Sequence, residues 1–267
     1  MSTIHKAMQA LIRADNILIA AGAGMGVDSG LPDFRGNKGF WNAYPALKGY
    51  PFAEMANPRW FQVEPRRAWG FYGHRLNLYR RTVPHEGFSI LKRWASTREH
   101  FIFTSNVDGA FQKAGFSEEQ IVECHGSIHH VQFVDAERGG EIWSANNIEV
   151  EVDERQVLAA EPLPMRNGQL LRPNILMFGD WGWLSGRSNA QEDRLGDWLR
   201  SIELGKTVII EMGAGTAIPS VRSFSEQLQS EGATLIRINP RESHGPTGTI
   251  SIADGAKKAL QEIDALL

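Results

Sequence analysis

The sequence predicts an α/β protein with a Rossmann-like, doubly wound parallel sheet and a second, smaller inserted module. Short, continuously apolar runs alternate with helix-like stretches along most of the chain, which is typical of parallel strands covered by helices on both faces. Two of the runs pass directly into glycine-rich turns. Two stretches, 37–81 and 127–171, interrupt the alternation, and we expect them to form the small module.

The apolar runs and the stretches between them give the expected elements in chain order. An amphipathic helix over 5–14 leads into a first strand at 17–21. Further strands are expected at 101–103, 121–122, 175–178, 208–210 and 235–238. Helices are expected at 88–96, 193–203 and 221–229, where the periodicity is helical. The large domain then comprises 1–36, 82–126 and 172–267.

The bulk composition is that of an ordinary globular protein. The chain has 267 residues, of which 42% are hydrophobic and 22% charged, and its net charge is −3. This balance predicts no polyanion-binding surface, so nucleic acid is not expected as a direct ligand. No apolar run resembles a signal peptide or a membrane span, and we expect a cytoplasmic protein without membrane contact. The single cysteine, Cys124, excludes an intrachain disulfide and a multi-cysteine metal site.

The segment ILIAAGAGMGVDSGLPDFRG, residues 17–36, is the first candidate for a cofactor site. A strand that runs into Gly22-Ala23-Gly24 suits a turn where the backbone approaches a phosphate. Val27 stands where a dinucleotide fingerprint has its third glycine, and a tight turn without any ligand gives the same pattern. Asp33-Phe34-Arg35 adds an aromatic ring and an anion-binding arginine, although Asp33 and Arg35 also suit a surface ion-pair cluster.

Polar residues follow the strand expected at 101–103. At the carboxyl edge of a parallel sheet, where open α/β folds bind ligands, Ser105, Asn106 and Asp108 come next in the chain. Asn106 suits hydrogen bonds with ribose hydroxyls, and Asp108 suits acceptance from a carboxamide NH₂. The alternative is a helix N-cap, which favours the same residue types.

His125 ends the strand expected at 121–122 and is the candidate general base. An imidazole titrates near neutrality, and a strand end lies at the expected mouth of the cleft. His129 and His130 raise the alternative of a metal site. Because neighbouring residues of a strand point to opposite faces, we expect no metal there.

A second glycine turn follows the strand expected at 208–210. Gly213-Ala214-Gly215 is a second candidate for backbone contact with a dinucleotide. Asn239 directly follows the strand expected at 235–238, in a position suited to a ribose.

In this order, the segments resemble the sirtuin family, and the chain is similar to a bacterial-type member that lacks the zinc-binding cysteines. Gly22–Gly24 followed by 29–35 matches the family's GAG…SGIPDFR signature, and 104–108 is similar to its TQNID segment. His125-Gly126 resembles its HG pair, and RPNILMFGD at 172–180 its RPxVVxFGE stretch. Gly213 to Thr216 falls at its GTS loop, and Ile238-Asn239 at its IN pair. The likeness extends over almost the whole chain.

The resemblance implies NAD held between a Rossmann-like domain and a small module. It implies an NAD-dependent protein lysine deacylase, which releases nicotinamide and an O-acyl-ADP-ribose from an acylated protein or peptide. His125 would deprotonate a ribose hydroxyl, while Asn106 and Asp108 would order the ribose and the carboxamide. Ala23, Phe34 and Arg35 would contact the cofactor, with Phe34 excluding water from the reactive carbon.

The resemblance also assigns the substrate-binding segment. Met177, Phe178, Gly179, Asp180 and Trp181 stand where deacylases pair with the substrate backbone. Trp181 and Trp183 would either reshape the acyl channel or pack within the small module.

The departures from the family pattern concern zinc and the ribose contacts. Most sirtuins carry four zinc-binding cysteines after the HG pair, whereas Phe133 stands at the expected first position and 127–171 contains no cysteine. No zinc is therefore expected, and Val131, Phe133, Val134, Ile142 and Trp143 are candidates for a replacing core. Gly26 and Ser105 replace the family's serine and glutamine, respectively.

Three other functions fit the same fold. The first is ADP-ribosyl transfer to a protein, and the second is NAD hydrolysis. The third is a non-catalytic NAD sensor, against which the retained His125 argues, since a pure binder needs no base.

Overall fold

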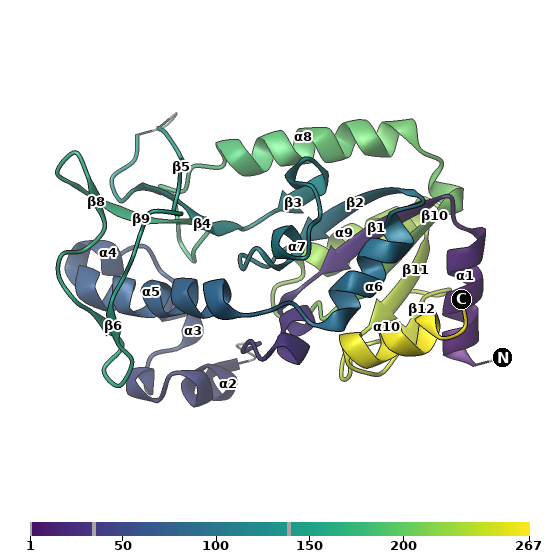
Figure 1. Cartoon of the computed structure of the whole chain (residues 1–267), viewed down its shortest axis with the longest axis horizontal. Coiled ribbons are helices and arrows are strands. Elements are labelled where there is room, and N and C mark those ends of the chain that lie inside the picture. The colour runs from purple at the N-terminus through teal and green to yellow at the C-terminus, as the bar shows by residue number, and fades with distance from the viewer. Residues whose placement is uncertain (1, 34–35, 138–139) are drawn as a thin grey trace.

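The computed structural model describes residues 2–33, 36–137 and 140–267, and a six-stranded parallel sheet forms its larger part (Figure 1). The strand order is β12-β11-β10-β1-β2-β3, and every neighbouring pair is parallel. The strands are β1 (Asn16–Ala21), β2 (Glu99–Thr104), β3 (Ile121–Glu123), β10 (Thr207–Met212), β11 (Thr234–Ile238) and β12 (Ile250–Ile252). All residues of β1 and β10 are buried, which explains the apolar runs at 17–21 and 208–210 in their sequences.

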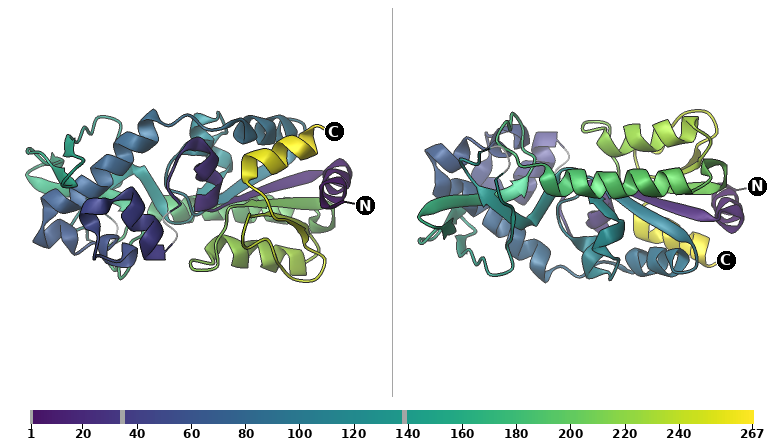
Figure 2. Two further views of the ribbon diagram at one scale, coloured as in Figure 1. Left: turned by 90° about the horizontal axis from the view of Figure 1, so that it is seen from below. Right: turned by 90° about the horizontal axis from the view of Figure 1, so that it is seen from above.

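Helices cover both faces of this sheet, as Figure 2 shows. Ile17 and Ile19 of β1 pack in one cluster with α1 (Thr3–Arg13), α6 (Glu86–Ala95), α7 (Ala110–Lys113) and α10 (Ala256–Asp264). Leu18 and Ala20 pack on the opposite face with α8 (Gly186–Ser201) and α9 (Ser220–Ser230). Alternate residues of one strand thus serve two cores, as expected for a sheet between two helical layers.

The second part of the molecule is a small module around α5 (Pro65–Arg81). Its antiparallel sheet has the order β5-β4-β9-β8, with β4 (Gly126–Phe133), β5 (Trp143–Ser144), β8 (Met165–Arg166) and β9 (Gln169–Ile175). The hairpin β6 (Val152–Asp153) and β7 (Leu158–Ala159) lies beside α5, and α2 (Gly36–Ala43), α3 (Phe52–Met55) and α4 (Trp60–Val63) complete the module. Short 3₁₀ turns are η1 (Ala23–Ser29), η2 (Pro45–Leu47), η3 (Glu118–Gln120) and η4 (Leu204–Lys206).

The fold class and most of the expected elements are confirmed. The expected strand at 175–178 is wrong: β9 ends at Ile175, and the next residues leave the sheet. The Leu176 amide donates to the His125 carbonyl, and the Phe178 amide donates to the Ala56 carbonyl, so this apolar run bonds to two loops instead. The boundary expected at 171/172 falls inside β9. Within the described ranges, no helix is long and apolar enough to cross a bilayer.

Gly70 lets α5 and β7 approach each other closely. A Cβ atom at this position would lie 2.1 Å from the backbone oxygen of Val157. We expect Gly70→Ala to lower the free energy of unfolding by about 2–3 kcal/mol, because the backbone must move apart. Urea unfolding measures this change. Gly186→Ala in α8, where nothing lies within 4 Å of the added atom, is the matched control, and an equal loss in both variants would contradict the prediction.

Candidate active site

Two glycine turns touch each other at the carboxyl edge of the large sheet. The Gly24 amide donates to the Gly213 carbonyl at 3.0 Å. Cβ atoms at Gly22 and Gly213 would lie 2.7 Å from Ala214 Cα and 2.2 Å from Met25 N, respectively. Gly213 also has a φ of +62°, which side chains disfavour. The contact between the two turns is therefore enough to require glycine at these positions, even without a ligand. Both turns lie at the edge where α/β sheets bind nucleotides.

The end of β2 is bonded to the first of these turns. The Ser105 amide and the Thr104 hydroxyl both donate to the Ala21 carbonyl, at 3.1 and 2.9 Å. The Asn106 side-chain amide donates to the Gly22 carbonyl at 3.1 Å. Asn106 thus lies directly against the first glycine turn.

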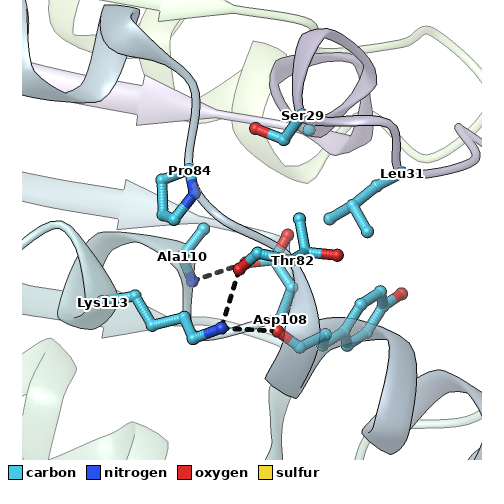
Figure 3. Close-up of a pocket in the computed structure, with 9 residues that line it drawn as sticks. Ser29, Leu31, Thr82, Pro84, Asp108, Ala110 and Lys113 are labelled. Carbon is cyan, nitrogen blue, oxygen red and sulfur yellow. Dashed lines mark hydrogen bonds between the residues drawn. The ribbon is translucent and has the colours of Figure 1, made fainter.

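Asp108 lies in a small pocket at the same edge (Figure 3). Its Oδ1 atom accepts a hydrogen bond from the Ala110 amide at 2.9 Å. Burial raises the pKa of the carboxyl to about 6, and nearby Glu123 adds to the rise, while the Ala110 amide opposes it. The other residues that line this pocket are Gly26, Ser29, Leu31, Tyr79, Thr82, Pro84 and Lys113.

Lys113 connects this pocket to the small module. Its Nζ donates to the carbonyls of Tyr79, Arg80 and Thr82, at 2.9, 2.6 and 2.7 Å. These carbonyls lie at the end of α5, where a lysine complements the helix dipole. One side chain therefore fixes the position of α5 relative to Asp108.

His125 follows β3 and lies between two serines. Its Nε2 atom is 3.1 Å from the Ser220 hydroxyl at the start of α9. Burial lowers the pKa of the imidazole, and a hydrogen bond with the Ser105 backbone opposes this shift. His125 is therefore neutral near neutral pH and suited to accept a proton. Burial raises the pKa of the adjacent Cys124 thiol to about 12, so that thiol is not a nucleophile.

Of the two histidines of β4, His129 has a hydrogen-bond partner, and the buried Nδ1 atom of His130 has none. His129 donates from Nε2 to the Asp108 carbonyl at 2.9 Å. His130 packs near Arg187, and its pKa falls to about 4 through burial, Arg187 and His129. Across residues 2–33, 36–137 and 140–267, no group of three or more His, Cys, Asp or Glu side chains is placed to hold a metal ion.

The side chain of Asn239 forms hydrogen bonds that hold the second glycine turn. It is fully buried, its amide donates to the Ala214 carbonyl at 2.9 Å, and its Oδ1 atom accepts from the Arg241 and Glu242 amides. The side chain is thus engaged within the protein; Ala214 is buried against it, and Gly215 is the partly exposed residue of the turn.

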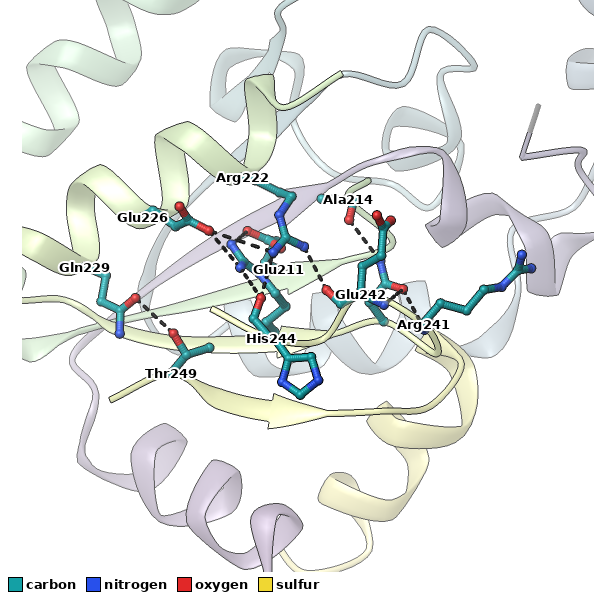
Figure 4. A network of polar contacts seen from close by, with 11 residues as sticks. Glu211, Ala214, Arg222, Glu226, Gln229, Arg241, Glu242, His244 and Thr249 are labelled. Carbon is teal, nitrogen blue, oxygen red and sulfur yellow. Dashed lines mark hydrogen bonds and ion pairs between the residues drawn. The ribbon is translucent and has the colours of Figure 1, made fainter. Parts of the chain in front are cut away.

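A buried charge network beneath this turn was missed from the sequence. Arg237 of β11 pairs with Glu211 of β10 at 2.5 Å and with Glu226 of α9 at 2.8 Å (Figure 4). Glu211 and Arg237 are direct neighbours in the parallel register. Arg222 extends the network by donating to the Glu242 carbonyl. The sequence signal for the ion pair was one acidic residue and one basic residue in two mostly apolar strands.

The segment after β9 divides into buried and exposed parts. The side chain of Asp180 is fully buried in an ion pair with Arg172 at 2.7 Å, so it holds the turn, and only its backbone is left for a substrate. Phe178 is 40% exposed and Trp181 is 99% exposed. Trp181 therefore does not pack within the small module.

Three predicted residues of the first glycine segment and one of the substrate segment remain. Asp33 is half-buried and follows η1 in the chain. Phe34 and Arg35 lie outside the described residues. Met177, assigned to substrate, is buried.

A Rossmann-like sheet with two touching glycine turns, a neutral histidine and a buried carboxyl at one edge defines a nucleotide-using α/β enzyme. The Sir2 family model matches residues 22–192, and the chain belongs to the Sir2 family. The predicted resemblance to sirtuins is thereby confirmed.

Similar proteins extend over nearly the full chain. "NAD-dependent protein deacylase 1" of Archaeoglobus fulgidus is 26% identical over 97% of this chain and 96% of its own length. An "NAD-dependent protein deacylase" of Aquifex aeolicus is 29% identical over 85% and 84%. The solved structure of a Sir2 homolog–NAD complex has a TM-score of 0.75 and 23% identity, covering 98% of this chain and 93% of that one; this likeness shows the fold.

The raised pKa of Asp108 predicts that this residue lowers the free energy of unfolding at high pH. Above about pH 6 the carboxyl ionises within the protein against its burial, so stability is lost as the pH rises through this value. We expect Asp108→Asn to raise the free energy of unfolding by about 2–3 kcal/mol near pH 8, and by little near pH 4. Urea unfolding at both pH values measures this difference. A destabilised variant at the higher pH would contradict the prediction.

Proposed function

We propose that the protein is an NAD-dependent protein lysine deacylase that releases nicotinamide and an O-acyl-ADP-ribose. The observation that carries the proposal is the position of His125, which follows β3 at the carboxyl edge of the sheet and has its Nε2 atom 3.1 Å from the Ser220 hydroxyl at the start of α9. The resemblance to sirtuins assigns the role of the base to His125, and the relatives named above are NAD-dependent protein deacylases.

The residues at the edge fit NAD. The glycine turns present backbone without side chains, which suits a pyrophosphate, and Asn106 lies against the first turn. Asp108 offers a carboxyl in a small pocket of its own, which suits a carboxamide NH₂. When bound, NAD supplies the ribose carbon from which nicotinamide leaves. Ala23, Asp33, Phe34, Arg35, Ser105 and Ala214 remain proposed cofactor residues of the same site, and Asn239 remains proposed as the residue that holds the second glycine turn.

His125 acts as the base at its Nε2 atom. The bond to the Ser105 backbone orients the ring, and Nε2 is left to accept a proton. In this structure the Ser220 hydroxyl lies against that atom at 3.1 Å. With NAD bound, Nε2 would be the atom that accepts the proton of a ribose hydroxyl, in place of the contact with Ser220.

The substrate segment is bonded to the base itself. The Leu176 amide donates to the carbonyl of His125 at 2.9 Å, so the strand end that would receive an acylated peptide has a fixed distance from the imidazole. Phe178, Gly179 and Trp181 are exposed beyond it and are the proposed substrate contacts.

We also propose that the small module, formed by 37–81 and 127–171, folds without zinc. Its residues do not fit a four-cysteine site, because the only cysteine of the chain lies at the end of β3. In its place Phe133 packs edge-on against Trp143 with ring centroids 4.8 Å apart, and the Arg166 guanidinium lies 4.5 Å from the Trp143 ring. Such contacts stabilise a small sheet without a metal.

The deacylase proposal predicts nicotinamide release that depends on an acylated peptide. With acetyl-, succinyl- and long-acyl-lysine peptides, we expect equal amounts of nicotinamide and O-acyl-ADP-ribose, and a loss of about a hundredfold or more in kcat for His125→Ala. Mass spectrometry of the products measures both. His5→Ala is the control, because His5 lies at an exposed position of α1, and it should leave kcat unchanged.

Three other outcomes would contradict the deacylase proposal and identify a different function. Nicotinamide release without any acceptor would identify an NAD hydrolase. Label from radioactive NAD on protein, with no acyl product, would identify an ADP-ribosyltransferase. Binding of NAD without turnover on any peptide would identify a sensor.

The zinc-free module predicts insensitivity to chelators. We expect less than about 0.1 equivalent of zinc by elemental analysis and no change in melting temperature with EDTA, because no metal contributes to folding. Trp143→Ala should lower the free energy of unfolding by about 2 kcal/mol, whereas the exposed Trp181→Ala should leave it unchanged. Stoichiometric zinc, or melting at a lower temperature in EDTA, would contradict this proposal.

A further inference from the structure

His85 connects the glycine turn η1 to the start of α6. It is the N-cap of α6, and its Nδ1 atom accepts from the Gly87 amide at 3.0 Å. On the other side of the ring, Nε2 lies 3.0 Å from the Met25 carbonyl. The backbone amide of His85 donates to the Ser29 hydroxyl at 2.9 Å. The buried ring therefore bonds a helix and a turn at once.

A second helix start holds η1 from another direction. The Asp28 carboxylate accepts from the Lys257 amide at 2.8 Å, at the beginning of α10. The turn thus lies between the N-termini of α6 and α10. Since η1 also provides Gly26 and Ser29 to the pocket of Asp108, its position determines the shape of the proposed nucleotide site.

The contacts of His85 require one charge state. Nδ1 faces an amide N–H and must carry a lone pair, and Nε2 faces a carbonyl and must carry the proton. Protonation places a second N–H against the Gly87 amide and a positive charge at the positive end of α6, so the cap contact is lost.

The surroundings of His85 oppose its protonation. Burial is the largest influence and lowers the pKa of its imidazole, and Lys257 of α10 lowers it further. Asp28 of η1 and the bond to the Met25 carbonyl act in the opposite direction. Glu86, the next residue of α6, is engaged with Gln261.

We propose that His85 is a positioning residue for the nucleotide: neutral His85 fixes η1, and its protonation releases η1 and weakens nucleotide binding. The inference rests on the proposed function, because it takes the glycine turns as the site of NAD. No contact between His85 and the nucleotide is involved.

ADP-ribose binding tests this inference. The probe lacks nicotinamide, so it makes no use of the Asp108 pocket. We expect its affinity for the wild type to fall in calorimetry as the pH is lowered from about 8 to about 5, by up to about fivefold, which is the fold-change expected when one helix cap is fully lost. In His85→Asn the fall should disappear, because an asparagine caps α6 at every pH. His5→Asn should keep the wild-type dependence.

The wild type provides a second measurement that needs no variant. In NMR spectra, the ring nitrogens of His85 should show the Nε2–H tautomer near neutral pH. The amide signals of Gly87 and Gly26 should shift with the midpoint of the His85 titration. Unchanged pH dependence of binding in folded His85→Asn, or η1 signals that ignore the titration, would overturn the inference. Absent ADP-ribose binding at every pH would instead reject the nucleotide site, while the NMR titration would still decide whether His85 controls η1.

Discussion

The contact between the turns after β1 and β10 is the constraint on which the rest of the site depends. Side chains are excluded at Gly22, Gly24 and Gly213 because the two backbones touch. Once the turns meet, the parallel register fixes where the neighbouring strands end. Asn106 and His125 follow β2 and β3 directly, so both residues lie at the same edge of the sheet. Gly22 and Gly213 are buried in this contact, whereas Gly24 stays partly exposed, so backbone without a side chain is available there, as a pyrophosphate requires.

The small module is attached to the large domain close to the candidate site, through the end of α5. Lys113 holds the last carbonyls of α5, and Arg80 donates from the same helix end to the carbonyls of Ala145 and Ile148. The helix is therefore fixed at one point to both parts of the molecule. Its buried aromatic residues, Trp69 and Phe71 among them, form a core that accounts for the stability of the module through apolar burial.

The sequence predicted the large sheet well because parallel strands buried on both faces are continuously apolar. The run at 175–178 has the same composition but leaves the sheet, because Asp180 forms a buried turn with Arg172, and composition does not encode such a turn. The polar residues after the strands were placed correctly at one edge, since that follows from parallel topology. The His85 cap and the Glu211–Arg237 pair escaped prediction. Histidine is an unusual cap, and a buried ion pair is recognised only once the register is known.

The isolated thiol of Cys124 has a consequence for the conditions in which the protein can work. Oxidants attack thiolates, and thiolate ligands of a structural metal are exposed to the same chemistry. Here the single thiol has its pKa raised to about 12 by burial, and the chain has no other cysteine. Peroxide therefore encounters no reactive thiol at His125 or in the small module. Activity of this chain is expected to persist under oxidative stress that would dismantle a cysteine-bound module.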